Sequence, residues 1–290
     1  MGHGDYSSSR RSVRATNLGY FTKPKEQIFQ QQSINNAMNP KGIGIRESRD
    51  SEEHPNSLAI IIALDVTGSM GSVPHYLVKE GLPHIVEQII NAGILDPQIL
   101  FLGIGDHVVD SAPLQVGQFE SSDELLDKWL TDVYLEGGGG GNEGESYMLA
   151  WYFAAKHTSI DCFEKRNKKG FLFTIGDEPV LESISQHHLN EIMGKGQYEK
   201  FMSNDLYHKA SEKYHAYHLH IKETMSGSRQ HVMDDWKQML SDNFIAVNRR
   251  NEVADIIAKI VSDSVNSDHH TTQDQSATAP EQTQDPTMML

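Results

Sequence analysis

The chain alternates between short apolar runs and segments with helical spacing, and both of its ends are polar. Three runs are continuously apolar and rich in β-branched or aromatic residues: residues 58–64, 99–104 and 171–175. Runs of this kind predict strands that are buried on both faces. We expect further strands at residues 114–119, 214–221 and 243–247, the first of them at a sheet edge, and helices at residues 73–92, 122–133, 147–157, 197–213 and 252–264. Because strands and helices alternate, the pattern predicts an α/β fold with a doubly wound, mostly parallel central sheet flanked by helices.

The two ends lack this periodicity. Residues 1–57 are rich in Ser, Asn, Gln and charge, which predicts a partly disordered N-terminal extension with a short strand near residues 42–46. We interpret its basic residues (Arg10, Arg11, Arg14, Lys23 and Lys25) as a solvated tail. Residues 266–290 are almost free of apolar side chains and predict a disordered C-terminal tail. A single domain is therefore expected over residues 58–265.

Composition narrows the classes of partner. The formal net charge of −15 disfavours binding to nucleic acid or to an anionic membrane over most of the surface. No run of about 18 apolar residues is present, so we expect no membrane-spanning helix. The single cysteine, Cys162, has no partner for an internal disulfide, which favours a reducing, cytoplasmic setting.

A loop with three oxygen-bearing side chains directly follows the first predicted strand. Asp65, Thr67 and Ser69 occupy alternate positions, and Gly68 lets the turn bend tightly. In an extended turn, alternate side chains point the same way, so their oxygens could face one point. Hard divalent cations such as Mg²⁺ bind oxygen ligands. A helix cap made by Thr67 or Ser69 is the plainer alternative.

Two further loops place oxygen ligands at helix or strand ends. A run of glycines, residues 137–141, precedes Asn142, Glu143 and Glu145 at the entry to a predicted helix. Asp177 follows the third core strand. A flexible linker and a simple turn would explain each loop by itself. Together with the first loop, however, they favour a divalent-cation site beyond the carboxyl ends of the strands, where open α/β sheets bind their ligands.

These residues resemble the metal-ion-dependent adhesion site of the von Willebrand factor A domain. Its first element, Asp-x-Ser-x-Ser, is matched by Asp65-x-Thr67-x-Ser69, with Thr in place of the first Ser. Asp177 matches the Asp that follows a later core strand in the family. The family's Thr in the Gly-rich loop is missing here; Asn142 stands in its place, and Glu143 or Glu145 could substitute.

The resemblance covers roughly residues 57–265 and implies a function. It implies that Mg²⁺, with Mn²⁺ or Ca²⁺ as alternatives, is held partly through water and captures an Asp or Glu of a protein partner. The domain would then be an adaptor and not an enzyme. Because intracellular bacterial and phage relatives resemble adaptors of AAA+ ATPases or other assemblies, the partner could be an ATPase of that class or an assembly component.

Two other interpretations remain open on the residues. A Mg²⁺-dependent phosphatase of the haloacid-dehalogenase type would use Asp65 as nucleophile and Asp177 in its acidic motif, although Thr67 stands where its general acid should be. His218 and His220 share one face of a predicted strand and could ligate zinc. A third zinc ligand is not evident, so we expect a core or interface role for both histidines.

Overall fold

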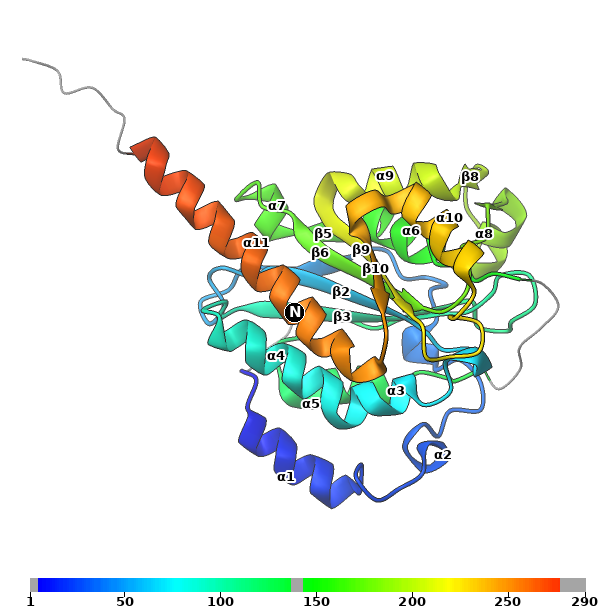
Figure 1. The fold of residues 1–290 in the computed structure, drawn as a ribbon, viewed down its shortest axis with the longest axis horizontal. Coiled ribbons are helices and arrows are strands. Elements are labelled where there is room, and N and C mark those ends of the chain that lie inside the picture. Colours follow the sequence, from blue (N-terminus) through cyan, green and yellow to red (C-terminus); the bar gives the residue numbers. More distant parts are fainter. Residues whose placement is uncertain (1–4, 137–142, 277–290) are drawn as a thin grey trace, which may run out of the picture.

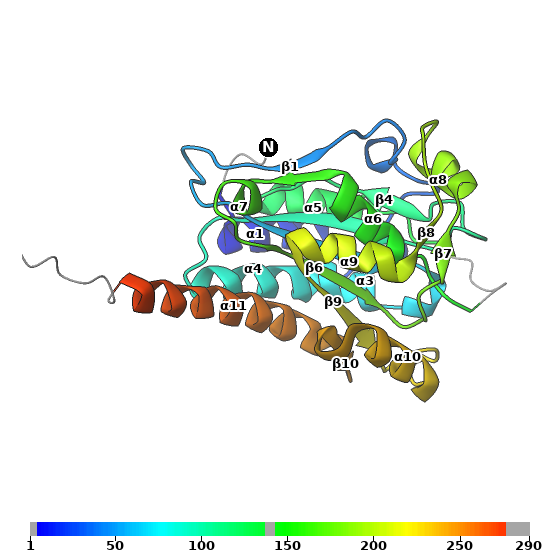
Figure 2. The ribbon, with the colours of Figure 1, turned by 90° about the horizontal axis from the view of Figure 1, so that it is seen from above.

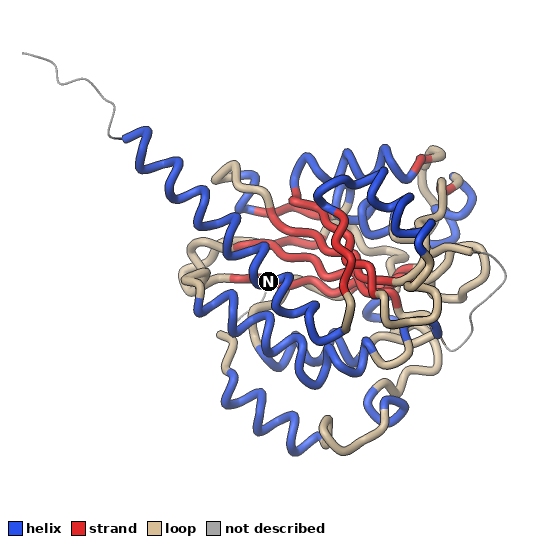
Figure 3. The backbone as a smooth tube through the Cα atoms, viewed as in Figure 1, coloured by secondary structure: helices blue, strands red, loops and turns tan. Residues whose placement is uncertain are grey.

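A six-stranded sheet forms the centre of the molecule (Figures 1 and 3). The computed structural model describes residues 5–136 and 143–276, with the backbone alone for residues 266–276. The strand order is β10-β9-β6-β2-β3-β4, and every neighbouring pair is parallel except β3 and β4. The strands are β2 (Leu58–Asp65), β3 (Pro97–Ile104), β4 (Leu114–Val116), β6 (Gly170–Gly176), β9 (Tyr214–Ile221) and β10 (Phe244–Val247). The predicted α/β class, with a mostly parallel sheet and an edge strand near residue 114, is confirmed.

Helices cover both faces of this sheet. Figure 1 shows α6, α9 and α10 on one side and α4, α5 and α11 on the other, and in Figure 2, seen from above, these layers overlap. The helices are α3 (Val73–Tyr76), α4 (Leu82–Asn91), α5 (Asp123–Thr131), α6 (Met148–Lys156), α7 (Asp161–Glu164), α8 (Gln186–Met193), α9 (Ser203–Lys213), α10 (Gln230–Leu240) and α11 (Val253–Ser276). A π-helical stretch, Leu77–Gly81, joins α3 to α4. Strands β2, β3 and β6 are buried along their whole length because both of their faces are covered.

Two predicted helices have different bounds. The helix expected at residues 197–213 begins only at Ser203, because Phe201–Met202 pairs as β8 with β7 (Ser183–Ile184). The last helix was expected to end at Ser264 but continues to Ser276. The remainder of the predicted C-terminal tail, residues 277–290, lies outside the described residues. Within the described ranges, no helix is both long and apolar enough to cross a membrane.

The N-terminal segment packs against the domain. Residues 5–57 contain helix α1 (Ser8–Leu18), helix α2 (Lys25–Ile28), a 3₁₀ turn (Asn36–Met38) and strand β1 (Arg46–Ser48), which pairs with β5 (Thr158–Ile160). The interpretation of its basic residues as a solvated tail is wrong for Arg11 and Arg14, because both form ion pairs with carboxylates of α5. The domain boundaries at residues 57/58 and 265/266 stay predictions.

The strand order places the topological switch point of the sheet between β2 and β6. From β2 the chain builds outward through β3 and β4; it then returns to the other side of β2 and builds outward again through β6, β9 and β10. The loops that leave β2 and β6 therefore diverge to opposite faces of the sheet and open a crevice at the carboxyl ends of these two strands. Asp65 is the last residue of β2, and Asp177 directly follows β6.

Candidate metal site

The loop after β2 brings its three oxygen-bearing side chains together. The Asp65 carboxylate accepts hydrogen bonds through Oδ1 from the Thr67 N–H (2.9 Å) and the Thr67 hydroxyl (2.6 Å). The hydroxyl oxygens of Thr67 and Ser69 lie 3.1 Å apart. A 3₁₀ turn over Gly68–Met70 produces this spacing by curling the backbone around the Asp65 carboxylate. The turn thus places the buried Thr67 hydroxyl and the partly buried Ser69 hydroxyl beside the buried Asp65 carboxylate.

Asp177 joins this cluster from the neighbouring strand. The Ser69 hydroxyl donates a hydrogen bond of 2.8 Å to Asp177 Oδ1. The second carboxylate oxygen, Oδ2, is buried and makes no hydrogen bond within the part of the chain that is described. Four of the predicted ligands, which lie more than a hundred residues apart at the extremes, therefore form one hydrogen-bonded group.

Tyr147 is a member of the site that the sequence reasoning missed. Its hydroxyl donates a hydrogen bond of 2.9 Å to Asp65 Oδ2, so both oxygens of that carboxylate are held. Tyr147 can approach only because residue 176 is glycine: a Cβ there would lie 1.8 Å from the Tyr147 hydroxyl. The glycine before Asp177 is thus the signal in the sequence that could have indicated this close approach.

Burial and crowding disfavour the negative charge of both aspartates. Burial, followed by the proximity of Asp177, raises the pKa of Asp65 to about 7, even though hydrogen bonds from Thr67 and Tyr147 act in the opposite direction. Burial also raises the pKa of Asp177, against the opposing effect of hydrogen bonds and of Arg229. Two buried carboxylates in close proximity need a positive partner to remain ionised. A divalent cation would supply that charge.

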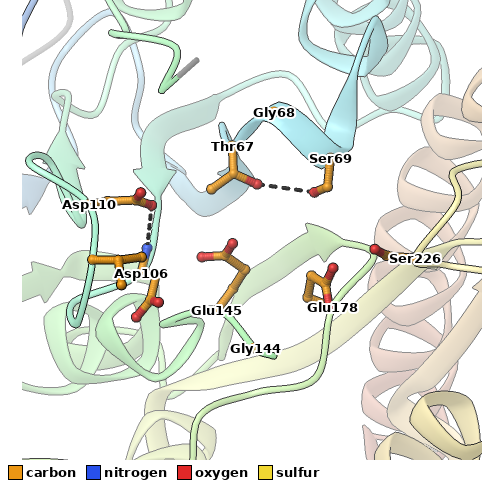
Figure 4. A pocket seen from close by; sticks show the side chains of 10 residues that line it. Thr67, Gly68, Ser69, Asp106, Asp110, Gly144, Glu145, Glu178 and Ser226 are labelled. Carbon is orange, nitrogen blue, oxygen red and sulfur yellow. Dashed lines mark hydrogen bonds between the residues drawn. The ribbon is translucent and has the colours of Figure 1, made fainter. Parts of the chain in front are cut away.

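A cavity of about 400 Å³ opens above the cluster (Figure 4). Its lining consists of Thr67, Gly68, Ser69, Asp106, Val109, Asp110, Gly144, Glu145, Glu178 and Ser226. Figure 4 shows the Glu145 carboxyl group pointing toward the hydroxyls of Thr67 and Ser69, with Asp106 and Asp110 on one side and Glu178 on the other. The cavity therefore connects the cluster with solvent and is lined by carboxyl groups.

The three predicted alternatives for the middle ligand have different positions. Asn142 lies outside the described residues. Glu143 is exposed, and its Oε1 is 3.6 Å from Arg229 Nη1. Glu145 is only 8% exposed, lines the cavity, and has one oxygen without a hydrogen-bond partner in the described residues. Burial, followed by the charges of Asp65 and other nearby carboxylates, raises the pKa of Glu145 to about 10.

The oxygen-bearing side chains of the site are of the type that binds a hard cation, but the described residues do not form a cluster of carboxylates arranged for metal binding. Among the described residues, no three His, Cys, Asp or Glu side chains converge at metal-binding geometry. The site instead combines two hydroxyls with buried carboxyl groups, and one oxygen each of Asp177 and Glu145 has no hydrogen-bond partner in the described part of the chain. Hydroxyl and carboxylate oxygens are the ligand types that Mg²⁺, Mn²⁺ and Ca²⁺ accept. Binding a cation would require the hydroxyl protons to turn away from the carboxylates.

His218 and His220 lie in the core, as expected. His218 stacks on Trp236 with ring centroids 3.7 Å apart, and its Nδ1 lies 2.9 Å from the Thr174 hydroxyl. The Nε2 atom of His220 lies 3.0 Å from the carbonyl oxygen of Gly227. Burial lowers the pKa of both rings, so both are neutral at neutral pH. Their contacts are those of packed core side chains.

Comparison with known proteins yields similarity in fold only. No protein-family model matches the sequence, and none of the curated proteins matches it. Among solved structures, the pilus adhesin SpaC from Lactobacillus rhamnosus GG aligns at 10% identity with a TM-score of 0.47, over 77% of this chain. The chain spans only 31% of the length of SpaC.

Two smaller solved structures align over most of their own length. One is the vWF domain of the type V pili tip protein Mfa5 from Porphyromonas gingivalis, at 8% identity, 72% of this chain, 94% of that domain and a TM-score of 0.44. The other is the conserved hypothetical protein BatB from Bacteroides thetaiotaomicron, at 11% identity, 72% of this chain, 99% of BatB and a TM-score of 0.43.

Proposed function

We propose that this chain is a protein-recognition domain whose binding surface includes a divalent cation, Mg²⁺ or alternatively Mn²⁺ or Ca²⁺. Asp65, Thr67, Ser69 and Asp177 would hold the ion, and Glu145 would provide the remaining protein ligand. The observation that carries this proposal is the hydrogen-bonded group of two carboxylates and two hydroxyls at the crevice between β2 and β6. In open α/β sheets this crevice is the usual ligand position.

The balance of charge supports a cation at this position. Asp65 is completely buried, and Asp177 keeps an oxygen without a hydrogen-bond partner among the described residues. Leaving a buried carboxylate oxygen unpaired is unfavourable, and an ion would satisfy it. The two hydroxyls face the cavity, so the ion would have a side that is accessible to a partner.

A phosphatase is a weaker proposal. Asp65 would have to attack a phosphoryl group, but the residue is completely buried and both of its carboxylate oxygens already accept hydrogen bonds. A nucleophile needs a free oxygen within reach of the substrate. We therefore propose a binding function in a cytoplasmic adaptor, with an ATPase of the AAA+ class or an assembly component as the kind of partner that the family resemblance implies.

Calorimetric titration with Mg²⁺ and Mn²⁺ tests the metal site directly. The full chain is compared with Asp65→Asn and Asp177→Asn, which remove one charge each and keep the shape of the side chain. We expect one ion per wild-type chain and at least a tenfold weaker affinity, about 1.4 kcal/mol, in each variant. Asp242→Asn removes a charge from an exposed aspartate in the 3₁₀ turn Ser241–Asn243, directly before β10, and is the matched control.

Two results would contradict the proposed metal-binding function, one in this titration and one in a separate assay of phosphoester hydrolysis. Equal affinity in wild type and both variants would contradict the proposed ligands. Hydrolysis of small phosphoesters that disappears in Asp65→Asn would instead support the phosphatase.

A further inference from the structure

The helical run that follows the proposed metal loop contains a wide turn. After the 3₁₀ turn that carries Ser69, α3 continues directly into the π-helical stretch Leu77–Gly81 and then into α4 (Figure 1). The Leu82 N–H donates to the carbonyl of Leu77, five residues earlier, where an α-helix would use the carbonyl four residues earlier. This wide turn sets how α3, and the loop before it, are placed relative to α4.

A proline accounts for the wide turn. Residue 83, in the first turn of α4, is proline. In a continuous α-helix its ring would clash with the carbonyl of Lys79, and it has no N–H to donate. The Lys79 carbonyl therefore loses the donor of an α-helical turn, and the Val78 carbonyl loses the donor of a π-helical turn. Because buried carbonyls without a donor are unfavourable, both carbonyls need a donor from outside the helix.

Arg11 of α1 supplies these donors. Its guanidinium group donates to the carbonyl oxygen of Val78 and to that of Lys79, the latter at 3.3 Å. The side chain is 4% exposed and also binds Asp127 of α5 at 3.1 Å. A guanidinium group carries five N–H donors in a fixed plane, so one side chain can serve all three acceptors. A segment far away in the sequence thus replaces the donor that Pro83 removes.

The same N-terminal segment also contacts the proposed metal loop itself. Lys25 Nζ donates to the carbonyl of Gly71 at 3.5 Å, directly after the 3₁₀ turn. Phe29 is buried and lines a small apolar cavity of about 10 Å³ together with Val66 and Pro74. Val66 belongs to the loop, and Pro74 belongs to α3. The N-terminal segment therefore supports both the loop and the helical run that follows it.

We propose that Arg11 is a positioning residue for the proposed metal site, because it fixes the wide turn and, through α3, the placement of Ser69. The inference rests on the proposed function for the role of the loop. Without Arg11 the two carbonyls would have to turn toward water, which would unwind the wide turn. Since α3 has only four residues, a change at its end reaches Ser69, whose hydroxyl lies 2.8 Å from Asp177 Oδ1.

The variant Arg11→Lys tests this inference in the full chain. Lysine keeps a positive charge beside Asp127, but its single nitrogen lacks the planar fork that reaches both carbonyls as well. In the calorimetric titration with Mg²⁺ we expect about a fivefold weaker affinity than in wild type. Arg10→Lys is the matched control, because Arg10 lies on the same helix with its side chain 64% exposed, and it should bind Mg²⁺ like wild type. Circular dichroism verifies that each variant is folded.

Pro83→Ala tests the physical cause separately. Alanine restores an N–H at position 83, which can donate to a carbonyl that Arg11 serves in wild type. In a double-mutant cycle, Arg11→Lys should therefore weaken Mg²⁺ binding by less than about twofold in the Pro83→Ala background. The loss in free energy of unfolding that Arg11→Lys causes in EDTA should also be smaller in that background. Any change in the ion pair with Asp127 occurs in both backgrounds and cancels in the cycle.

Each contrary result has a distinct meaning. Wild-type Mg²⁺ affinity in Arg11→Lys would make Arg11 a purely structural residue and overturn the inference. An equal effect of Arg11→Lys in both backgrounds would assign the effect to Asp127 and overturn the role of the carbonyls. If wild type binds no Mg²⁺, the proposed function is wrong, and amide hydrogen exchange of residues 66–72 decides whether Arg11 positions the loop. Faster exchange in Arg11→Lys than in Arg10→Lys would support that role, and equal exchange would overturn it.

Discussion

Single buried carboxyl groups at the proposed metal site lower the stability of the metal-free fold. Asp65 is buried beside Asp177, and the hydrogen bonds from Thr67 and Tyr147 do not offset the effect of burial on its pKa, which is raised to about 7. A carboxyl group whose pKa is raised in the folded state destabilises the fold progressively as the pH rises from its unfolded pKa, about 3.9, to its folded pKa, and the loss is complete above the latter. At alkaline pH without a cation, Asp65 therefore lowers the free energy of unfolding.

Replacing Asp65 by Asn should raise the stability of the metal-free protein. The amide keeps the acceptor for Thr67 and can donate to the Tyr147 oxygen, while the charge is removed. At pH 8 in EDTA we expect the free energy of unfolding to increase by about 1–3 kcal/mol. Chemical denaturation measures this change, and Asp242→Asn, a surface substitution, should stay within about 0.5 kcal/mol of wild type. A less stable Asp65→Asn variant would show that its hydrogen bonds outweigh the charge.

Two arginines of helix α1 bind the helix to the domain through ion pairs with α5, and the sequence of α1 alone does not predict these ion pairs. Arg11 is 4% exposed and donates to Asp127 Oδ1 at 3.1 Å and to the carbonyl oxygens of Val78 and Lys79. Arg14 binds the second oxygen of Asp127 at 3.0 Å. Because these guanidinium groups are paired with buried carboxylates, α1 is an integral part of the packing around α5.

The substitution Arg11→Met should therefore lower the free energy of unfolding much more than the substitution Arg10→Met. Arg11→Met leaves Asp127 buried with Arg14 alone and frees two backbone carbonyls, so we expect a loss of about 2–4 kcal/mol in chemical denaturation. Arg10 is the control, since its side chain is 64% exposed and lies 3.5 Å from Asp123. Arg10→Met should cost about 0–1 kcal/mol. Equal effects would mean that α1 is not docked as described.

At the scale of the whole molecule, an ion-pair network ties the N-terminal segment to the side of the domain that carries α7. Asp161 accepts hydrogen bonds from Arg49 at 2.8 Å and from the Asp50 N–H at 2.9 Å, and forms an ion pair with Lys165 at 2.6 Å. Burial alone would raise the pKa of Asp161, but the contacts with Lys165, Asp50 and Arg49 lower it to about 2. The N-terminal segment before β2 is therefore bound to the rest of the domain at two places, through α1 and through this ion-pair network.

This network should contribute to acid unfolding. Since the pKa of Asp161 in the folded state is below its unfolded value of about 3.9, its stabilisation is fully present above about pH 5 and is lost as the pH falls toward 2. Asp161→Asn should lower the free energy of unfolding by about 1–2 kcal/mol at pH 7 and have progressively less effect down to pH 2. Denaturation curves at a series of pH values measure this difference. A pH-independent difference would assign the effect to packing.

The sequence by itself determined the core strands and the main helices that flank them, and tertiary structure decided the contacts between them. Apolar runs predicted β2, β3 and β6 because a strand buried on both faces must be apolar along its length. The placement of Asp65 and Asp177 at strand ends followed from the same pattern. Their link through Ser69, the approach of Tyr147 over Gly176 and the burial of Glu145 depend on which strands are neighbours, and this arises from packing between distant segments. The interpretation of Arg11 and Arg14 as solvated was wrong for the same reason: an arginine in a polar segment looks solvated in the sequence until folding supplies a buried carboxylate.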